Sequence, residues 1–278
     1  MLDNFSIDQM SPRLRDFLHL VWDNRNVPEL DLYKLYVGGR PHDPSNDYAA
    51  ACDRPAVILF LEALEHSSNQ ASIEIRIQAW GSSITDINDA RKHASDQGTE
   101  RWQDVGKSFY HFPKGGAANW RIYLNVPVLH RGVVACFIAE KIVAVLNGVT
   151  NAKVLGPAGI GWDTIVIYLA DEASVNDTLK IIAEYQQQNA THFNAPTIHL
   201  ARPAEYEGKK LIGVATACEP AEHAKNLGLQ KKPSFGDFWE LLLLPILNQT
   251  RYQSEEAFLK RVLQQMRILN MDPKNPEM

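Results

Sequence analysis

Apolar residues recur at helical spacing near the start of the chain and again towards its end. The Ser11-Pro12 pair is typical of a helix that begins with a side-chain cap and a first-turn proline. Apolar positions then follow at helical intervals: Leu14, Phe17, Leu18 and Val21. The same period predicts helices over 235–247 and 254–269, and a shorter one over 55–65. We therefore expect helical parts at both the N-terminal and the C-terminal ends.

Strand patterns fill the middle of the chain. Isoleucines alternate with polar residues from Ile73 to Gln78, which predicts a half-buried strand over 72–79. Further on, the expected order is strand 121–126, helix 128–146, strand 152–155, strand 164–169, helix 174–187 and strand 211–217. Strand, helix, strand, strand, helix, strand is the split βαβ arrangement of ferredoxin-like units. The predicted fold class is α+β, with a central ferredoxin-like mixed sheet, helices, and helical parts at both ends.

Composition indicates a globular protein and excludes several functional classes. Hydrophobic residues make up 45 % of the 278 residues, and the formal net charge is −5. An acidic total argues against a dedicated nucleic-acid binder. Three widely spaced cysteines, Cys52, Cys136 and Cys218, favour neither a disulfide framework nor a cysteine-based zinc site.

Targeting signals are not visible in the sequence either. The first residues contain no basic start followed by an apolar core, and the longest apolar run, 241–247, is too short to span a membrane. We therefore expect a cytoplasmic protein with no nucleic-acid partner and no membrane partner. A signal-independent secretion route would leave no trace in these patterns.

The charge is distributed unevenly along the chain. Residues 105–162 contain six cations and only one acid, Glu140, so this stretch carries +5 and the rest of the chain −10. The cations are Lys107, Lys114, Arg121, Arg131, Lys141 and Lys153. Such a basic stretch in an acidic chain indicates either a site for an anionic ligand or a basic surface with no ligand. Charge alone leaves both interpretations open.

Familiar catalytic motifs are missing. The glycine-rich stretch 156–161 (GPAGIG) resembles a phosphate-binding loop, but a strand follows it rather than a helix, so we expect a strand-to-strand connection. No HExxH pair, GxSxG nucleophile or kinase signature occurs, and the histidines show no metal-ligand spacing. The sequence predicts no metal and no organic cofactor.

A series of short stretches carries a resemblance to a known family from about residue 105 onward. They are 106–110 (GKSFY), 120–125 (WRIYLN), 146–147 (LN), 152–154 (AKV), 163 (D), 167–169 (IYL), 196–197 (PT), 213–220, 234–236 (SFG) and 270–276. In this order and spacing the chain resembles the Hop-A class of plant-pathogen type III effectors. Relatives of that class are encoded in lanthipeptide and thioamitide biosynthesis clusters. We accordingly divide the chain into 1–104, a helical and β region packed on the core, and 105–278, a Hop-A-like α+β core.

The resemblance implies the chemistry of a phosphothreonine lyase. In the biosynthetic relatives a partner kinase phosphorylates Ser or Thr of a peptide, and the Hop-A-like protein eliminates the phosphate to leave a dehydroamino acid. Lys153 would then be the base, and Tyr110 or His111 the acid. Lys107 and Arg121 would hold the phosphate, with Asp163 and His199 as further substrate contacts.

Three positions depart from the family pattern. Gly161 stands where the family tends to have an arginine, Asp237 follows the Ser-Phe-Gly stretch in place of a basic residue, and His199 lies where a lysine is frequent. Each change removes a cation from a position that could contact phosphate. Two functions therefore stay open: a lyase acting on phosphorylated Ser or Thr, and a non-catalytic effector or partner-binding protein with the same fold.

Overall fold

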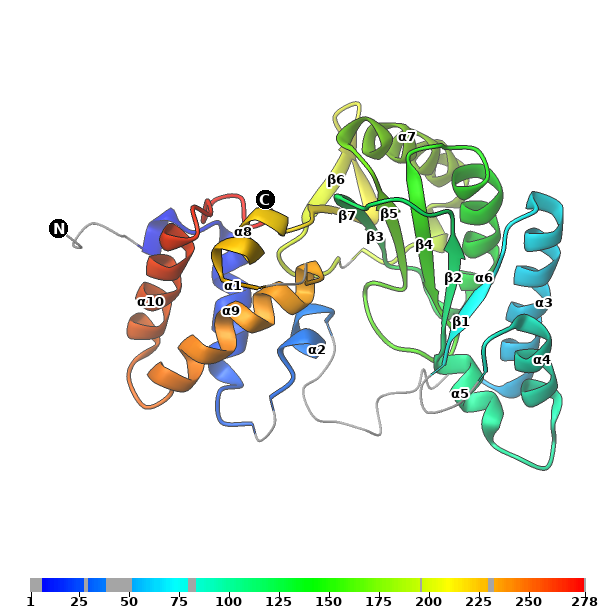
Figure 1. Ribbon diagram of the computed structural model, residues 1–278, viewed down its shortest axis with the longest axis horizontal. Helices are drawn as coiled ribbons and strands as arrows, with labels where there is room; N and C mark the ends of the chain where they lie inside the picture. Colours follow the sequence, from blue (N-terminus) through cyan, green and yellow to red (C-terminus); the bar gives the residue numbers. More distant parts are fainter. Residues whose placement is uncertain are drawn as a thin grey trace. The chain divides into compact units, whose positions relative to one another are not determined.

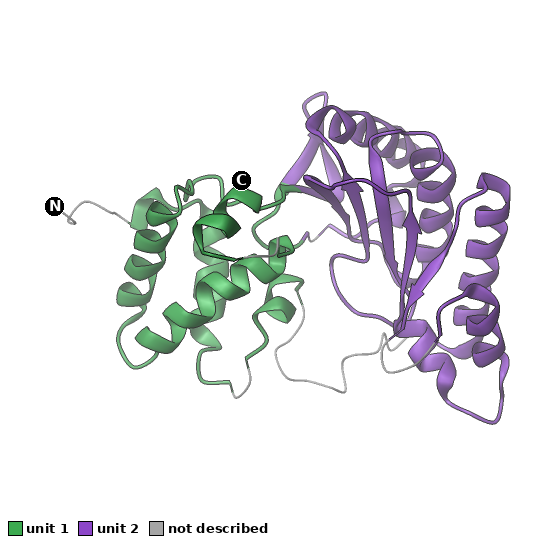
Figure 2. Cartoon of the chain, viewed as in Figure 1, with its two compact units in different colours: residues 1–43, 198–202, 217–278 green, residues 44–197, 203–216 purple. Residues whose placement is uncertain are grey.

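The computed structural model describes residues 7–27, 30–38, 52–79, 84–195, 197–229 and 233–277. These residues form an α+β protein whose strands belong to one seven-stranded sheet (Figure 1), which confirms the predicted class. Two compact units make up the chain (Figure 2). Unit 1 comprises residues 1–43, 198–202 and 217–278, and unit 2 comprises 44–197 and 203–216. The division at residue 104, drawn where the family resemblance begins, stays a prediction.

Unit 1 is built from helices at both ends of the sequence. They are η1 (Ile7–Gln9), α1 (Pro12–Asp23), α2 (Leu32–Tyr36), α8 (Ala221–Asn226), α9 (Phe235–Thr250) and α10 (Glu255–Ile268). The Ser11 hydroxyl accepts a hydrogen bond from the Leu14 N–H, as its position before Pro12 predicts. The four apolar residues of α1 that share one face are all buried. The prediction of terminal helical parts is thereby confirmed.

Unit 2 holds most of the sheet and the helices that cover it. Its helices are α3 (Arg54–Ala71), α4 (Ile87–Ser95), α5 (Arg101–Lys107), α6 (Val128–Phe137), the π-helix η3 (Ile138–Val143), α7 (Glu172–Asn189) and η4 (Ala190–His192). The strands are β1 (Arg76–Gln78), β2 (Phe109–Pro113), β3 (Trp120–Leu124), β4 (Val149–Leu155), β5 (Ile165–Leu169), β6 (Arg202–Tyr206) and β7 (Lys209–Cys218). None of the described helices is long and apolar enough to cross a membrane.

The order of the sheet is β1-β2-β4-β5-β3-β7-β6. Its four central neighbours, β4-β5-β3-β7, are the strands of the predicted split βαβ unit in the spatial order that such a unit produces. Pairing is antiparallel between β1 and β2, β2 and β4, β4 and β5, and β5 and β3. Two strands that the sequence patterns did not indicate, β2 and β6, extend this core on opposite sides.

The predicted strand over 72–79 is shorter in the structure. Helix α3 runs on to Ala71, and Ser72 closes it in a left-handed conformation with φ of 54°. The Ile73 N–H then bonds the Ser68 carbonyl at the helix end, and the strand begins only at Arg76. The predicted helix 128–146 is present as α6 followed by η3.

The two faces of the sheet differ in chemistry because side chains alternate along each strand. One face is apolar and packs against the helices of unit 2; it includes Tyr110, Phe112, Val154, Ile165 and Ile167. The opposite face, which we call the polar face, carries Arg76, Gln78, Phe109, His111, Arg121, Asn151, Lys153 and Tyr168, and in the same register the buried Leu155, Val166 and Tyr123. The eight residues named first are exposed or half-buried.

Candidate functional site

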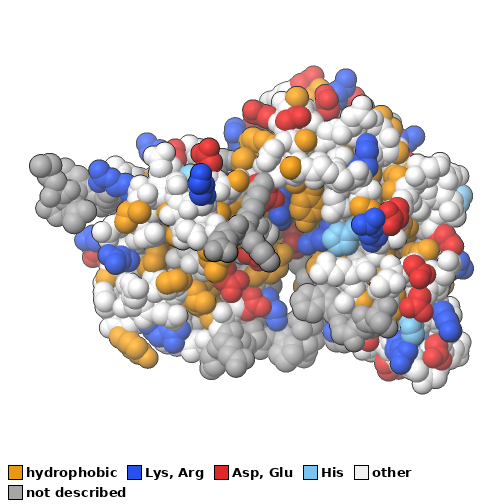
Figure 3. All heavy atoms as spheres, viewed as in Figure 1, with side chains coloured by type: hydrophobic (Ala, Val, Ile, Leu, Met, Phe, Trp, Pro, Cys, Tyr) orange, Lys and Arg blue, Asp and Glu red, His pale blue; other side chains and the backbone are white. Residues whose placement is uncertain are grey.

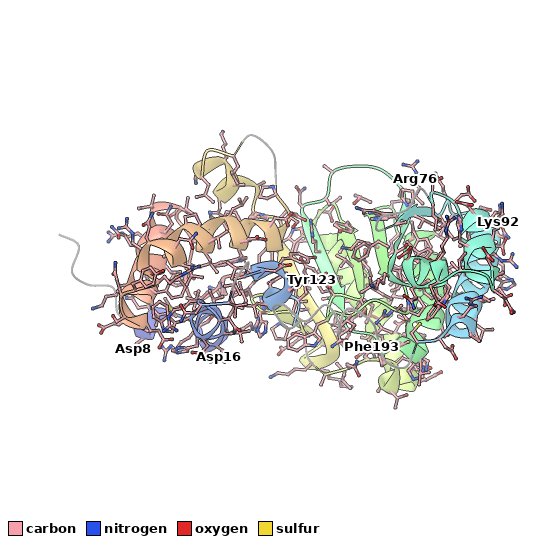
Figure 4. All side chains as sticks on the ribbon, turned by 90° about the horizontal axis from the view of Figure 1, so that it is seen from below. Asp8, Asp16, Arg76, Lys92, Tyr123 and Phe193 are labelled. Carbon is pink, nitrogen blue, oxygen red and sulfur yellow. The ribbon has the colours of Figure 1, made fainter. Side chains whose placement is uncertain are left out.

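Three basic side chains share one row across the polar face. His111 on β2 lies opposite Arg76 on β1 and opposite Lys153 on β4. Residues that are directly opposite in an antiparallel pair project from the same face, with Cβ atoms about 5 Å apart. Figure 3 shows basic side chains and a histidine side by side on this face, and Figure 4 labels Arg76 at its edge. The sheet therefore brings together two of the predicted catalytic residues, His111 and Lys153.

The imidazole of His111 is held between two amides. Its Nε2 lies 3.3 Å from Oε1 of Gln78, and its Nδ1 lies 3.3 Å from Nδ2 of Asn151. A ring that donates from Nε2 and accepts at Nδ1 is the neutral form. Burial, and then the positive charge of Lys153, lower the pKa of His111 to about 4. The hydrogen bonds and the electrostatics agree that His111 is uncharged near pH 7.

Lys153 carries the positive charge of this row. Its Nζ lies 4.2 Å from the ring centroid of Phe109, on the neighbouring strand. No carboxylate pairs with it among the described residues. Arg76 differs, because its guanidinium makes two bonds to the Glu74 carboxylate, at 2.7 and 3.0 Å. Lys153 is thus the member of the row whose charge is left to attract an anion.

Arg121 lies on the same face in the next row. It is opposite Tyr168 on β5, and its guanidinium carbon lies 4.7 Å from the centroid of the Tyr168 ring. Strand β5 separates it from Lys153, so the two backbones are about 10 Å apart or more. Lys153 packs towards β2 and Arg121 packs on β5. The polar face therefore offers two separate cations, each resting on an aromatic ring.

Tyr110 does not join this face. It is the strand neighbour of His111, so its side chain projects to the apolar face, where it is fully buried. Its hydroxyl donates to the Val105 carbonyl at 2.8 Å, and burial raises its pKa well above the usual value for tyrosine. The structure therefore does not place the Tyr110 hydroxyl beside Lys153.

Lys107 and Asp163 lie outside the row. Lys107 ends α5 and is half-buried. Asp163 is buried in the loop between β4 and β5, which confirms that the glycine-rich stretch connects two strands. The fully buried Arg131 holds this loop, because its Nη1 donates to the carbonyls of Gly156 at 2.5 Å and Gly159 at 3.0 Å. Arg131 therefore belongs to the framework and is not exposed to a ligand on the polar face.

His199 lies in unit 1, not on the polar face of the sheet. Its ring stacks on Phe17, with ring centroids 5.4 Å apart, and its backbone N–H donates to the Tyr36 carbonyl at 3.1 Å. Burial lowers its pKa, while Asp16 acts in the opposite direction. Its role as a substrate contact stays a prediction.

Several residues of the polar face were not proposed from the sequence. Gln78 and Asn151 fix the tautomer of His111, and Phe109 supports Lys153. The alternation of polar residues from position 74 to 78 was a visible signal for the face of β1. No comparable signal marked Phe109 or Asn151, because their importance depends on the pairing of β2 with β4.

The described residues contain no cluster of three or more His, Cys, Asp or Glu side chains that could hold a metal ion. Their polar face presents instead an uncompensated amine, a neutral imidazole and aromatic rings. This arrangement can bind an anion by charge and orient it by hydrogen bonds. The site thus defines an α+β protein with an anion-attracting sheet face.

Comparison with known proteins adds the identity of the fold. No protein-family model matches the sequence, and no curated protein matches it. Several chains of solved structures do match, among them two effector proteins from Pseudomonas syringae. The effector of pathovar tomato strain DC3000 has a TM-score of 0.63 at 18 % identity, covering 96 % of this chain and 95 % of that one. The effector of pathovar syringae strain 61 has a TM-score of 0.64 at 17 % identity, covering 99 % of both chains. The chain therefore has the fold of these effectors over almost its whole length.

Proposed function

We propose that the protein is a type III effector of the Hop-A class that acts by binding a partner protein. The observation that carries this proposal is the extent of the fold match, which includes both compact units and not only the sheet. The sequence resemblance supports it separately, because most of its short stretches lie in or beside β2, β3, β4, β5 and β7. A fold shared at this identity does not determine function by itself, so the function needs a direct test.

Secretion is the first property to measure. The full chain, fused to a reporter that is active only inside plant cells, is expressed in Pseudomonas syringae and in a mutant lacking a working type III apparatus. We expect reporter activity in infected leaves from the first strain and none from the mutant. Equal signals from the two strains, or no signal from either, would contradict the effector proposal. Before export the protein would reside in the bacterial cytoplasm.

Binding through the polar face is the second property. A partner segment with carboxylate or phosphate groups would be attracted by Lys153 and Arg121, and Phe109 and Tyr168 would supply apolar contact beside each charge. Lys153→Gln should weaken such a complex, whereas Lys141→Gln should not, because Lys141 lies exposed on η3. The two variants remove the same charge, so equal losses would show that net charge alone determines binding.

Elimination of phosphate from phosphorylated Ser or Thr is the second candidate function. The observation that favours it is the position of His111 directly opposite Lys153. In this scheme the unprotonated amine of Lys153 takes the Cα proton, and the Cα–H electrons form the Cα=Cβ bond. The Cβ–O bond breaks, and its electron pair leaves with the phosphate. The Nε2–H of neutral His111 would donate its hydrogen bond to the leaving phosphate in place of Gln78. Arg121 would pair with a negative charge at another position of the substrate.

Mass spectrometry distinguishes this candidate from simple binding. A phosphothreonine peptide incubated with the protein should lose phosphoric acid, with or without a partner kinase that supplies the phosphorylated substrate. Lys153→Ala should abolish the loss, and Lys141→Ala should preserve it. An unchanged peptide in the presence of a stable complex would leave the effector proposal standing and remove the lyase. Continued elimination by Lys153→Ala would refute the assignment of the base.

A further inference from the structure

Unit 1 contains a cavity that the proposed function does not use. Its volume is about 460 Å³, which lies within the usual range for small-molecule sites. One wall is the first two turns of α1 with its cap Ser11, and the other is the tail after α10. The lining residues are Ser11, Pro12, Arg13, Asp16, Lys274, Pro276 and Glu277. Figure 4 labels Asp16 on α1.

Each wall of this cavity carries one cation and one carboxylate. Arg13 and Asp16 are three residues apart on α1, and Lys274 and Glu277 are three residues apart on the tail. No salt bridge joins any of these four side chains to another described residue. Two positive and two negative groups thus line one small cavity without neutralising each other at contact distance.

The cationic side of the cavity is the better defined. Arg13 donates from Nη1 to the Ala201 carbonyl, which fixes its guanidinium while most of its donors remain for a ligand. Burial lowers the pKa of Arg13, and the charge of Glu277 opposes this effect. The helix N-terminus adds to the positive potential. Pro12 has no N–H and the Leu14 N–H bonds Ser11, so the Arg13 N–H is the first-turn donor that remains among the described residues.

We infer that this cavity binds a zwitterion, a free amino acid or a short peptide with a free ammonium and a free carboxylate. The carboxylate would take the Arg13 guanidinium and backbone N–H together with the Lys274 ammonium. The ammonium would lie between the Asp16 and Glu277 carboxylates. A ligand with a single charge would contact one side of the cavity only and would lack the ion pair and hydrogen bonds that the other side offers, although Asp16 and Lys274 are exposed and Arg13 and Glu277 half-buried. This site lies within unit 1 and is independent of the polar face.

Calorimetric titration of the full chain with four probes tests the inference. Triglycine carries both charges at peptide length, glycine carries both at amino-acid length, N-acetyl-triglycine lacks the ammonium, and triglycine amide lacks the carboxylate. We expect triglycine or glycine to bind. Tighter binding of triglycine would identify the ligand as a peptide, and tighter binding of glycine would identify it as an amino acid. Each capped probe should bind at least about tenfold more weakly than triglycine, if triglycine is the ligand. No heat from either zwitterion, or equal binding of the capped probes, would overturn the inference.

Variants locate the binding on the cavity. Asp16→Asn should weaken binding of the zwitterion about tenfold and remove its advantage over the acetylated probe. Lys274→Gln should remove its advantage over the amide probe. Asp23→Asn is the matched control, because it makes the same change on an exposed position of the same helix. Unchanged binding by Asp16→Asn, with the far-ultraviolet circular dichroism of the parent, would refute the site even if a zwitterion binds elsewhere.

Discussion

His111 on β2 and Lys153 on β4 lie directly opposite each other on the polar face of the sheet. The lysine contributes to keeping the imidazole neutral, and the amides of Gln78 and Asn151 bond the two nitrogens of the neutral ring. A cation beside a neutral hydrogen-bonding group is a pair that can hold an anion by charge and by hydrogen bonding. The pair owes its geometry to the antiparallel register of two strands.

The first prediction concerns the titration of His111. Burial and Lys153 lower its pKa to about 4, so nuclear magnetic resonance of the imidazole should show a neutral ring down to about pH 5. Lys153→Met should raise this pKa, though not to the ordinary value of about 6.5, because burial remains the larger cause. A pKa for His111 that stays the same in Lys153→Met would show that the two side chains do not interact electrostatically.

The same shift has a consequence for stability. Between about pH 6.5 and about pH 4 the unfolded chain binds a proton at His111 that the folded chain does not. The free energy of unfolding should therefore fall as the pH is lowered through this window. Partial exposure reduces the effect to about 1 kcal/mol. Urea denaturation of the parent and of His111→Gln measures it, since the difference between the two should change across this window and be constant above it.

The second prediction is that the Tyr110 hydroxyl contributes to stability and not to binding or turnover at the polar face. Tyr110→Phe removes the hydrogen bond to the Val105 carbonyl in the core, and the free energy of unfolding should fall by about 1 kcal/mol. Binding or turnover at the polar face should not change, because the ring remains and its hydroxyl lies on the other side of the sheet. Loss of activity in a folded Tyr110→Phe protein would restore its predicted role as the acid.

Tyr110 also shows where inference from the sequence ends. The central strands were predictable because branched apolar residues dominate them, as in 164–169 (TIVIYL), and helices with clear caps or breaks separate them. Strand β2 (FYHFP) has aromatic residues on both faces and ends in proline, so its alternation is not visible. When no strand is predicted here, the sequence shows Tyr110 and His111 only as adjacent residues. Once β2 is known, the alternation of side chains places them on opposite faces of the sheet.

The locations of two other residues, His199 and Arg131, are determined by tertiary packing and could not be predicted from local sequence patterns. His199 belongs to a five-residue segment, 198–202, that leaves unit 2 and joins the unit formed by both ends of the chain. Arg131 is one of six cations in a basic stretch, and its sequence neighbours do not distinguish it from the exposed Lys141. What makes it a core residue is the pair of loop carbonyls that it meets more than twenty positions later.

The third prediction concerns that buried arginine. Arg131 bonds two carbonyls of the β4–β5 loop, and burial lowers its pKa to about 10. Arg131→Met should reduce the free energy of unfolding by about 3 kcal/mol, because both carbonyls would remain buried without a donor. Lys141→Met serves as the control and should change stability by less than about 0.5 kcal/mol. Urea midpoints give both values, and similar losses for the two variants would show that Arg131 does not hold the loop.

The last prediction uses two glycines of the β6–β7 hairpin that share a left-handed backbone. Gly208 has φ of +74° and nothing within 4 Å of the position a Cβ would take. Gly213 has φ of +63°, but its Cβ would lie 2.1 Å from the Asn194 carbonyl oxygen and 3.1 Å from that of Asn125. Both alanine variants carry the same conformational cost of about 1 kcal/mol. Gly213→Ala must in addition displace backbone in a junction where Asn125 bonds both Gly213 and Asn194.

We therefore expect Gly208→Ala to lose about 1 kcal/mol of unfolding free energy and Gly213→Ala about 3 kcal/mol or more. Both variants carry the cost of the left-handed backbone angle. The difference between their losses of unfolding free energy therefore measures the cost of crowding the Asn194 segment against β7. Denaturant unfolding of the two variants side by side measures it. Equal losses would mean that the Asn194 segment moves aside without cost, and the contact between it and β7 would then contribute little to the stability of unit 2.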